Sequence, residues 1–356
     1  MAHIILNKKK LEHNYYYLNT FFNENDIEWS AVTKILCGHK KYLQLLLDLK
    51  PKSISDSRIT NLKIVKDINP DCQTIYIKPP AKGVIQDIIK YADISLNSDI
   101  YTIQLLNEEA AKKKIIHKVI LMIDLGELRE GVMRDGFLDL FAAVLKLKNI
   151  EIVGIGSNLS CLYGVLPNTD KLNQLNLYRQ LVEIKHGIKI KYLSGGSSVT
   201  IPLIENKSLP LEINHFRVGE TLFMGTNAYN HTPYENLKQN IFELRAEIIE
   251  LYEKPIVPSG ELGVNVDGET SKFDTNDIGK KTIRALVDIG LLDVDIKHLT
   301  SADDSVIIEA ATSDITVLDL GENKNNYKVG STVKLNLDYM GIVRIMNSKY
   351  IDKVIE

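Results

Sequence analysis

Cysteine is scarce in this sequence. Only Cys37, Cys72 and Cys161 occur in 356 residues, an odd number without the close pairing that zinc ligands show. We therefore expect neither a disulfide framework nor a zinc or other metal site. Disulfides are common in oxidising compartments and rare in the cytosol, so the sequence favours a cytoplasmic protein.

An excess of positive charge and a long apolar run are also absent. Lys and Arg number 43 against 46 Asp and Glu, which gives a net charge of -3. Nucleic-acid-binding domains are typically basic, so we expect no nucleic-acid partner. No stretch approaches the roughly 18 apolar residues of a membrane helix. The apolar run near the N-terminus is too short for a signal peptide, and we expect no membrane partner.

What is present is an alternation of two patterns over the first two thirds of the chain. Short apolar, β-branched runs predict strands at 27–33, 53–57, 74–79, 93–98, 118–125, 150–159, 190–196 and 214–219. Between them, segments such as 40–49, 57–68, 100–114 and 168–187 have helical spacing, and Asn168 or Thr169 can cap the last one. Strands alternating with helices predict parallel pairing and, with eight repeats, a closed (β/α)8 TIM barrel. An open doubly wound sheet is the alternative.

After about residue 230 the pattern changes. Strand-like runs at 244–257, 281–290, 305–311, 315–320 and 331–346 are separated by turn-forming stretches instead of helices. Such spacing predicts an antiparallel β domain. We expect a barrel over residues 8–230 and a C-terminal β domain over 231–356, with the strand at 3–7 able to pair with the second domain.

Polar residues follow several of the predicted barrel strands, where catalytic side chains of such barrels lie. They are Lys34, Ser57, Asn97, Arg129, Asn158, Ser197 and Arg217. Three are cations, which is unusual for strand ends unless an anion lies among them. Lysine is almost never buried without a partner. Lys34, after an apolar strand, therefore either closes a salt bridge or has a chemical role.

The stretch SGGSS at 194–198 indicates a phosphate site. Glycines let backbone N–H groups approach a ligand, Ser197 and Ser198 supply hydroxyls, and a helix predicted after them would add positive potential at its N-terminus. Gly219 follows the next strand. The ends of the seventh and eighth strands are where barrels frequently bind phosphate, although an ordinary tight turn is the simpler interpretation of this stretch.

Lys34 and the predicted phosphate site together suggest a cofactor. The first strand neighbours the eighth in a closed barrel, so Lys34 can reach a ligand anchored there by its phosphate. Pyridoxal 5'-phosphate has a phosphate and an aldehyde that reacts with lysine, and it is the cofactor we expect. The alternative is a barrel enzyme for another phosphorylated metabolite, with Lys34 in a structural ion pair.

Four motifs resemble the fold type III pyridoxal-phosphate enzymes typified by alanine racemase. They are AVTK ending at Lys34, DLGELREGV at 124–132, SGGSS at 194–198 and HFRVG at 215–219. The sequences of these motifs, together with TKxxCG, SNLSC and LDYMGIVRIM, are most similar to those of ornithine racemases. The resemblance covers essentially the whole chain. It implies an isomerase that interconverts L- and D-amino acids, with ornithine or another basic amino acid as substrate, and a homodimer with shared active sites.

The resemblance also implies how the cofactor is held. Lys34 would form the internal Schiff base, and Arg217 would face the pyridine nitrogen. Asn158 stands where relatives have a histidine packed on the cofactor ring. The phosphate would be bound by Ser197 or Ser198 with the backbone of Gly219 and Glu220.

For catalysis, the resemblance places Arg129 near the substrate carboxylate and Tyr339 in the lining of the site. Lys34 is the natural base on one face of the substrate. The base on the other face stays open among Cys161, Tyr163, Tyr339 and Asp293 of the partner subunit. The distal ammonium of a basic substrate needs an acidic group, for which the candidates are Glu127, Glu130, Asp293 and Asp295.

Three departures distinguish the chain from alanine racemases. Met122 replaces a carboxylated lysine that supports the arginine in many of them, Leu291 replaces the partner-subunit tyrosine that acts as second base, and the tyrosine after the family's lysine is absent from 37–39. The alternatives are an alanine or broad-specificity racemase, a non-catalytic cofactor-binding protein, and a decarboxylase. The long segment after the barrel disfavours the second, and the absence of cysteine after Cys161 disfavours the third.

Overall fold

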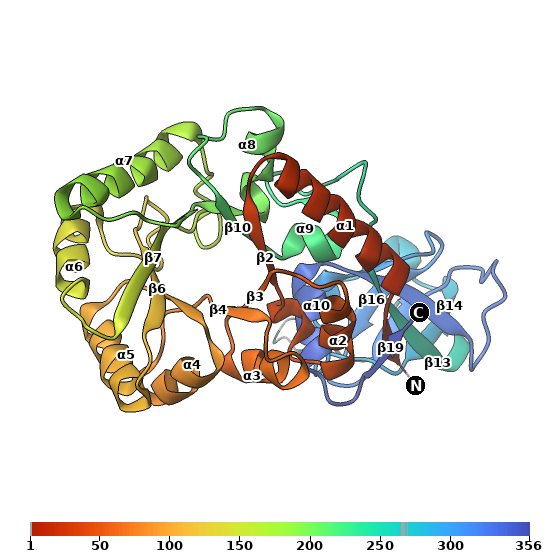
Figure 1. Cartoon of the computed structure of the whole chain (residues 1–356). Helices are drawn as coiled ribbons and strands as arrows, with labels where there is room; N and C mark the ends of the chain where they lie inside the picture. The colour runs from red at the N-terminus through yellow and green to blue at the C-terminus, as the bar shows by residue number, and fades with distance from the viewer. Residues whose placement is uncertain (1, 265–267, 269) are drawn as a thin grey trace. The chain divides into compact units, whose positions relative to one another are not determined.

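The structure is a computed structural model that describes residues 2–264, 268 and 270–356. It divides into two compact units (Figure 1). One comprises Lys8–Gln239, and the other comprises Met1–Asn7 with Asn240–Glu356.

The Lys8–Gln239 unit is a closed parallel barrel. Its strands are β2 (Glu28–Val32), β3 (Ser53–Asp56), β4 (Gln73–Tyr76), β5 (Ile94–Asn97), β6 (His117–Met122), β7 (Ile150–Gly156), β8 (Tyr192–Ser194), β9 (Gly196–Ser197) and β10 (His215–Val218). Their hydrogen-bonded order is β8-β7-β6-β5-β4-β3-β2-β10-β9. β8 and β9 are parts of one predicted strand divided at Gly195. Because β8 pairs with β7 and β9 pairs with β10, the sheet closes. The predicted barrel is therefore confirmed, and the open sheet is excluded.

Helices lie outside this ring of strands (Figure 1). They are α1 (Lys8–Glu24), α2 (Lys40–Asp48), α3 (Ile59–Ile68), α4 (Ile85–Tyr91), α5 (Ile100–Lys113), α6 (Phe137–Val144), α7 (Thr169–His186), α8 (Ile201–Glu205) and α9 (Glu220–Met224). α7 begins where the sequence predicts, because the Asn168 side chain accepts a hydrogen bond from the Lys171 N–H at 2.9 Å. Gly187 ends it with a positive φ of 66°, a conformation that glycine adopts without strain.

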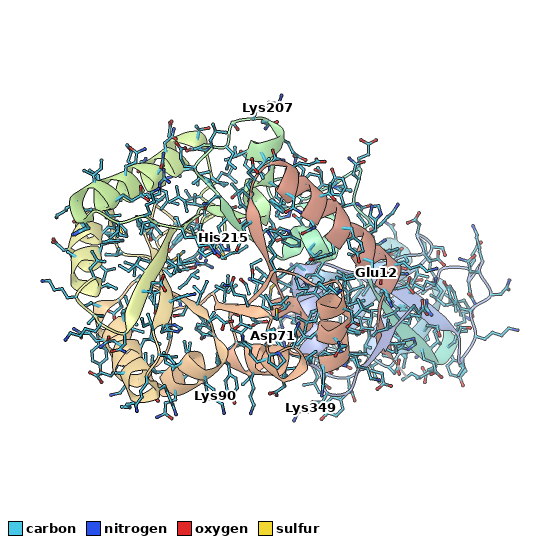
Figure 2. The ribbon with its side chains drawn as sticks, viewed as in Figure 1. Glu12, Asp71, Lys90, Lys207, His215 and Lys349 are labelled. Carbon is cyan, nitrogen blue, oxygen red and sulfur yellow. The ribbon has the colours of Figure 1, made fainter. Side chains whose placement is uncertain are left out.

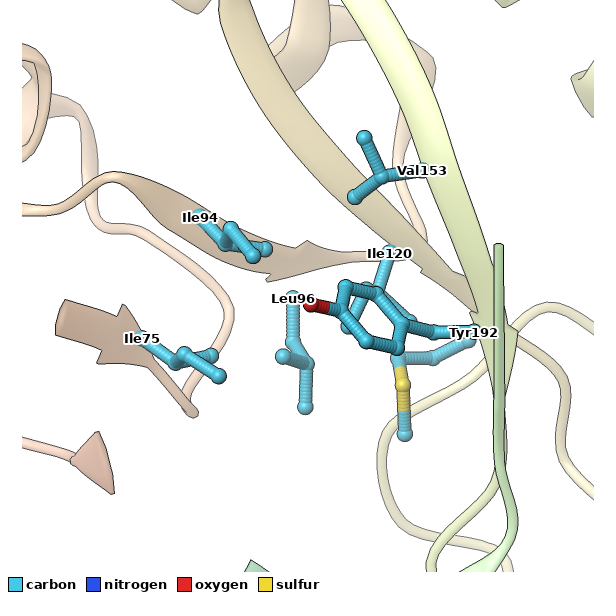
Figure 3. Packing of buried hydrophobic residues seen from close by; sticks show 7 residues of the cluster. Ile75, Ile94, Leu96, Ile120, Val153 and Tyr192 are labelled. Carbon is cyan, nitrogen blue, oxygen red and sulfur yellow. The ribbon is translucent and has the colours of Figure 1, made fainter. Parts of the chain in front are cut away.

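An apolar cluster fills the interior of the barrel (Figure 3). It consists of Ile75, Ile94, Leu96, Ile120, Met122, Val153 and Tyr192. His215, labelled in Figure 2, continues this interior from β10, and its ring centroid lies 4.8 Å from that of Tyr192. Since the interior is packed, a ligand has room only at the strand ends and their loops.

In its described residues, the second unit has an antiparallel sheet and one α-helix. Its strands are β1 (His3–Leu6), β13 (Phe242–Pro255), β14 (Lys281–Val287), β15 (Leu299–Ser301), β16 (Ile307–Ala311), β17 (Thr316–Asp319), β18 (Thr332–Leu337) and β19 (Asp352–Ile355). The order is β15-β18-β13-β14-β17-β16. β1 pairs antiparallel with β13 and parallel with β19. This sheet confirms the predicted antiparallel β class.

One element of this unit was predicted wrongly. The run 331–346 is a strand only as far as Leu337, and α10 (Tyr339–Asn347) follows it. The Asp338 side chain caps this helix by accepting from the Gly341 N–H at 2.7 Å. Ile342 and Ile345 then recur at helical spacing and are buried. The β-branched composition of the run concealed both signals.

Candidate active site

Three neighbouring strands bring the predicted cofactor residues to the same end of the barrel. Arg217 on β10 lies opposite Ser30 on β2 and opposite Ser197 on β9. All three strands run parallel, so the residues that follow them leave the barrel at the same rim. Lys34, which follows β2 after Thr33, and Gly219, directly after β10, therefore belong to one edge.

Lys34 begins the short helix η1 (Lys34–Leu36) and has an exposed side chain. Its position is fixed from below by Thr33, whose hydroxyl donates to Asp56 Oδ2 at 2.8 Å. Asp56 is fully buried and also accepts from the Asn61 amide at 3.1 Å. Burial raises the pKa of Asp56, while hydrogen bonds and the charge of Lys34 oppose that rise. Lys34 is thus an accessible cation on a rigid turn.

Arg217 is the opposite case, because its guanidinium is buried. Nη1 donates to the Ser194 carbonyl at 3.0 Å and to the Ser194 hydroxyl. Nη2 donates to the Ser157 carbonyl at 2.9 Å and to Asn158 Oδ1 at 2.5 Å. Burial lowers the pKa of Arg217 to about 10, with Glu130 opposing the fall. The group therefore remains charged at neutral pH.

Arg217 is the first member of a continuous polar chain. The Asn158 amide donates to Glu130 Oε1. Glu130 binds Arg129, with Nη2 at 2.8 Å from Oε1 and Nε in contact with Oε2. Arg129 Nη1 in turn lies 2.8 Å from the sulfur of Cys161. Four predicted site residues, Arg217, Asn158, Arg129 and Cys161, are therefore brought together through Glu130.

The region predicted to bind phosphate, 194–198, is shaped by a short helical turn and by close strand packing. Ser197 caps η4 (Ser198–Thr200), and the Ser198 hydroxyl accepts from the Thr221 N–H at 3.3 Å. The expected following helix exists, but α8 has only 5 residues. A Cβ on Gly196 would lie 2.2 Å from the Phe216 ring, so this glycine is required by strand packing. Packing against Phe216 is thus a structural reason for glycine at this position, beside the expected role in ligand approach.

The residues at this rim fit pyridoxal phosphate. The Ser197 and Ser198 hydroxyls can donate to a phosphate, Gly219 follows β10 without a side chain, and Lys34 offers an exposed amino group on the adjoining strand. Beside Arg217, the buried Ser157 hydroxyl has no hydrogen-bond partner among the described residues. A polar ligand at these strand ends would supply one.

The four carboxylates considered for a substrate ammonium all have internal partners. Glu130 binds Arg129, as described above. Glu127 accepts several backbone N–H groups, including that of Cys161 at 2.8 Å. Asp293 accepts from the Ser348 hydroxyl at 2.6 Å, and Asp295 lies 2.7 Å from Lys297. The engagement of Glu127 and Glu130 was missed by the sequence analysis, because it depends on how two loops meet.

Two further candidates have different surroundings. Tyr163, on the loop after β7, has 68% of its surface exposed. Tyr339 begins α10 and belongs to the second unit, as do Asp293 and Leu291. No disulfide joins the three cysteines, and within the described ranges no cluster of His, Cys, Asp or Glu could hold a metal ion. Among the same residues, no helix is long and apolar enough to span a membrane.

Comparison with known proteins reveals similarity over the whole chain. The family described as "Alanine racemase, N-terminal domain" matches residues 6–227. The ornithine racemase of Acetoanaerobium sticklandii is 33% identical over 351 residues, which cover 98% of this chain and 98% of that protein. The lysine racemase of Thermotoga maritima is 30% identical over 353 residues, which cover 99% of this chain and 98% of that protein.

Solved structures have the same fold. The alanine racemase of Bartonella henselae, a structure with covalently bound pyridoxal phosphate, superposes with a TM-score of 0.75 and 15% identity. The match covers 100% of this chain and 99% of that one. An alanine racemase of Clostridium difficile gives a TM-score of 0.75 with 17% identity, over 100% of this chain and 95% of that one.

Proposed function

This chain belongs to the alanine racemase family, and from that premise we propose that it interconverts the L- and D-forms of a basic amino acid, ornithine or lysine. The observation that carries the proposal is the full-length similarity to one ornithine racemase and one lysine racemase. The strand-end arrangement supports it, because Lys34 follows β2 and Arg217 lies on the adjoining β10, at the rim where a barrel acts.

We propose pyridoxal phosphate as the cofactor. Lys34 would hold it covalently, Ser197 and Ser198 with the backbone N–H groups of Gly219 and Glu220 would bind the phosphate, and Arg217 and Asn158 would contact the ring. When bound, the cofactor makes the α-proton of an amino acid removable by spreading the resulting negative charge. Arg217 keeps its own protons and cannot accept one, so it restrains how far that charge spreads.

The chain's own side chains would then move the α-proton. Lys34, as a neutral amine, accepts or returns it on one face. Arg129 orients the substrate by binding its carboxylate in a charge-assisted pair. For the other face we propose Cys161 or Tyr339, with Tyr163 and Asp293 of the partner subunit as alternatives. Cys161 has in its favour that its sulfur contacts Arg129, the residue proposed to hold the substrate.

The assembly is a further part of this proposal. We propose two domains, a barrel over residues 8–230 that binds the cofactor and a C-terminal β domain over 231–356 with the strand at 3–7. A homodimer would complete the site, and apolar side chains on the loops after β6 and β7 favour a covered surface: Leu128 is 62% exposed and Leu162 is 57% exposed. Three cysteines without a disulfide favour the reducing cytoplasm as the compartment.

The substrate is tested by chiral chromatography of the holoenzyme incubated with L-ornithine, L-lysine, L-alanine or L-serine. We expect a kcat/KM for ornithine or lysine about tenfold or more above that for alanine, since a site that pairs a polar substrate group rejects analogues without it. A preference for alanine would contradict the basic-substrate assignment. A cofactor-loaded protein that inverts none of these amino acids would contradict the racemase assignment and favour a cofactor-binding protein without catalysis.

A further inference from the structure

The carboxylate of Glu127 is bound almost entirely by backbone N–H groups. Its side chain leaves the loop after β6, and the residue is 1% exposed. Oε1 accepts from Cys161 at 2.8 Å, Leu162 at 2.5 Å and Tyr163 at 2.9 Å. Oε2 accepts from Ser160 at 3.1 Å and Val165 at 3.0 Å. Five donors on one carboxylate are far more than a solvated surface charge acquires.

These contacts fix the ionisation state of Glu127. Burial alone would raise the pKa of the carboxyl, but the backbone donors outweigh it and hold the pKa below its usual value. The residue is therefore a carboxylate at neutral pH. The donors belong to one short stretch, 160–165, so the negative charge holds the curled backbone of this loop together.

The loop that carries Glu127 is itself anchored. Asp124 Oδ1 accepts from the Gly126 N–H at 2.7 Å, and Asp124 Oδ2 accepts from the Arg129 N–H at 3.1 Å. Lys171 Nζ donates to the Leu125 carbonyl at 2.7 Å. Glu127 thus connects a fixed loop, 124–131, with the loop that follows β7.

This connection determines what surrounds Arg129. The stretch clasped by Glu127 contains Cys161, whose sulfur receives Arg129 Nη1 at 2.8 Å. Asn158, just before that stretch, donates to Glu130, the ion-pair partner of Arg129. If the loop after β7 moved away, Arg129 would lose one direct contact and its partner Glu130 would lose another.

We propose that Glu127 is a positioning residue for Arg129, acting through the 160–165 loop; this rests on the proposed function in so far as Arg129 binds the substrate carboxylate. Glu127 does not itself touch substrate. It holds the loop after β7 in the one conformation in which Cys161 and Asn158 restrain the Arg129–Glu130 pair, and so it sets the affinity for an amino acid.

Glu127→Gln is the informative substitution, because it nearly preserves shape and removes charge. One carboxylate oxygen becomes an NH2 group, which would face N–H donors on either side of the site and cannot accept from them. Glu151→Gln, an exposed carboxylate on β7, is the matched control. Both variants are made in the full chain and compared as holoenzymes.

Hydrogen exchange measures, without any substrate, how strongly Glu127 protects the backbone amides that donate to it. In the wild-type protein, the five amides that donate to Glu127 should be protected, and in Glu127→Gln they should exchange about tenfold or more faster. Glu151→Gln should leave them unchanged. Unprotected amides in the wild-type protein, or equal exchange in wild type and Glu127→Gln, would overturn the proposal even if the variant folded poorly or the substrate were wrongly assigned.

Steady-state kinetics with ornithine distinguishes positioning from simple stabilisation. Glu127→Gln should raise KM about fivefold or more with kcat within about twofold, because substrate binding is lost. Glu151→Gln, the matched control, should keep the wild-type KM and kcat. A wild-type KM in Glu127→Gln, despite accelerated exchange, would reduce Glu127 to a structural role and overturn the proposal.

Discussion

At the rim of the barrel, two cations, one on β10 and one just after the adjoining β2, are held in contrasting ways. Arg217 on β10 is 5% exposed and donates to protein oxygens on β8 and at the end of β7. Lys34, after β2, is exposed on a turn whose support comes from Thr33 and Asp56. The first is part of a network that extends through Asn158 and Glu130 to Arg129. The second has an exposed side chain, and its charge lowers the pKa of Asp56 and of Glu220 against the effect of burial.

The contrast separates two tasks of the proposed enzyme. Groups that stabilise developing charge act best when they are fixed before the reaction, because no reorganisation is then needed. A group that forms a bond and carries a proton must be accessible. The side of the rim formed by β6, β7 and β10 is built for the first task, and the side formed by β2 is built for the second.

The largest expected effect is on the accessible side. Lys34→Ala should lower kcat for racemisation by more than about a thousandfold, since it removes the proposed nucleophile and base. Because Lys34 is exposed, the free energy of unfolding should stay within about 0.5 kcal/mol of wild type. Chiral chromatography and urea unfolding measure the two quantities, with Lys40→Ala as the exposed control. If Lys34→Ala kept more than a tenth of wild-type activity, Lys34 would not be the group that forms the bond and carries the proton.

Substitution of the buried Arg217 should lower the free energy of unfolding as well as activity. Arg217→Met would leave the Ser194 and Ser157 carbonyls and Asn158 without their donor and Glu130 less compensated, at a cost of about 3–5 kcal/mol of unfolding free energy. Arg134→Met is the control, because Arg134 is exposed and its guanidinium donates to the amide oxygen of Gln174 at 3.1 Å. Equal losses in the two variants by urea unfolding would show that Arg217 is not held as described.

Gly196, between β8 and β10, can be required for strand packing or for binding a ligand, and an alanine substitution distinguishes the two roles. A Cβ there would lie 2.2 Å from the Phe216 ring, so Gly196→Ala should cost about 1–3 kcal/mol by overpacking. Gly83→Ala, where nothing lies within 4 Å of the added Cβ, is the control. Lost cofactor affinity with wild-type stability would instead assign Gly196 to the ligand.

The smallest predicted effect concerns acid stability next to Arg217. Burial, with the charge of Arg217, lowers the pKa of His215 to about 3 from an ordinary 6.5. Below pH 6.5 the unfolded chain therefore binds a proton that the folded chain does not, so His215 makes stability fall on acidification by up to about 1.4 kcal/mol per pH unit. His215→Gln removes this contribution.

The measurement is urea unfolding of wild type and His215→Gln at neutral pH and at mildly acidic pH. The stability difference between them should narrow as the pH falls, because only the wild type loses the His215 contribution. Burial also lowers the pKa of His117, to about 4. Because His117 is present in both proteins, its contribution to the pH dependence of stability cancels in the difference. A difference that is constant with pH would mean that His215 is not buried in its neutral form.

The sequence predicts the barrel well, for a physical reason. Strands covered on both faces must be apolar and helices must repeat at about 3.6 residues, so both patterns are local. Polar residues at the ends of the predicted strands then indicate Lys34 and Arg217 as candidate site residues before any contact is known. In the second unit the same reasoning failed at α10, where the Asp338 cap decides the structure although β-branched residues follow it.

What the sequence could not predict are contacts between loops. Glu127 and Glu130 read as surface charges, because nothing local shows that the backbone of 160–165 curls around one carboxylate or that Asn158 meets the other. Loop conformation depends on positive-φ residues such as Ser160 and Gly164, with φ of 55° and 71°. A Glu next to Gly126, in the loop that follows the strand predicted at 118–125, was the available signal for Glu127.

The most direct test is α-proton exchange of L-ornithine in D2O, followed by NMR with chiral analysis of the product, for wild type and for cofactor-loaded Lys34→Ala. The account predicts that wild type incorporates deuterium at the α-carbon and forms D-ornithine, while Lys34→Ala does neither. Exchange by Lys34→Ala at a rate near that of wild type would contradict it, because the proton would then be moved by a group other than Lys34.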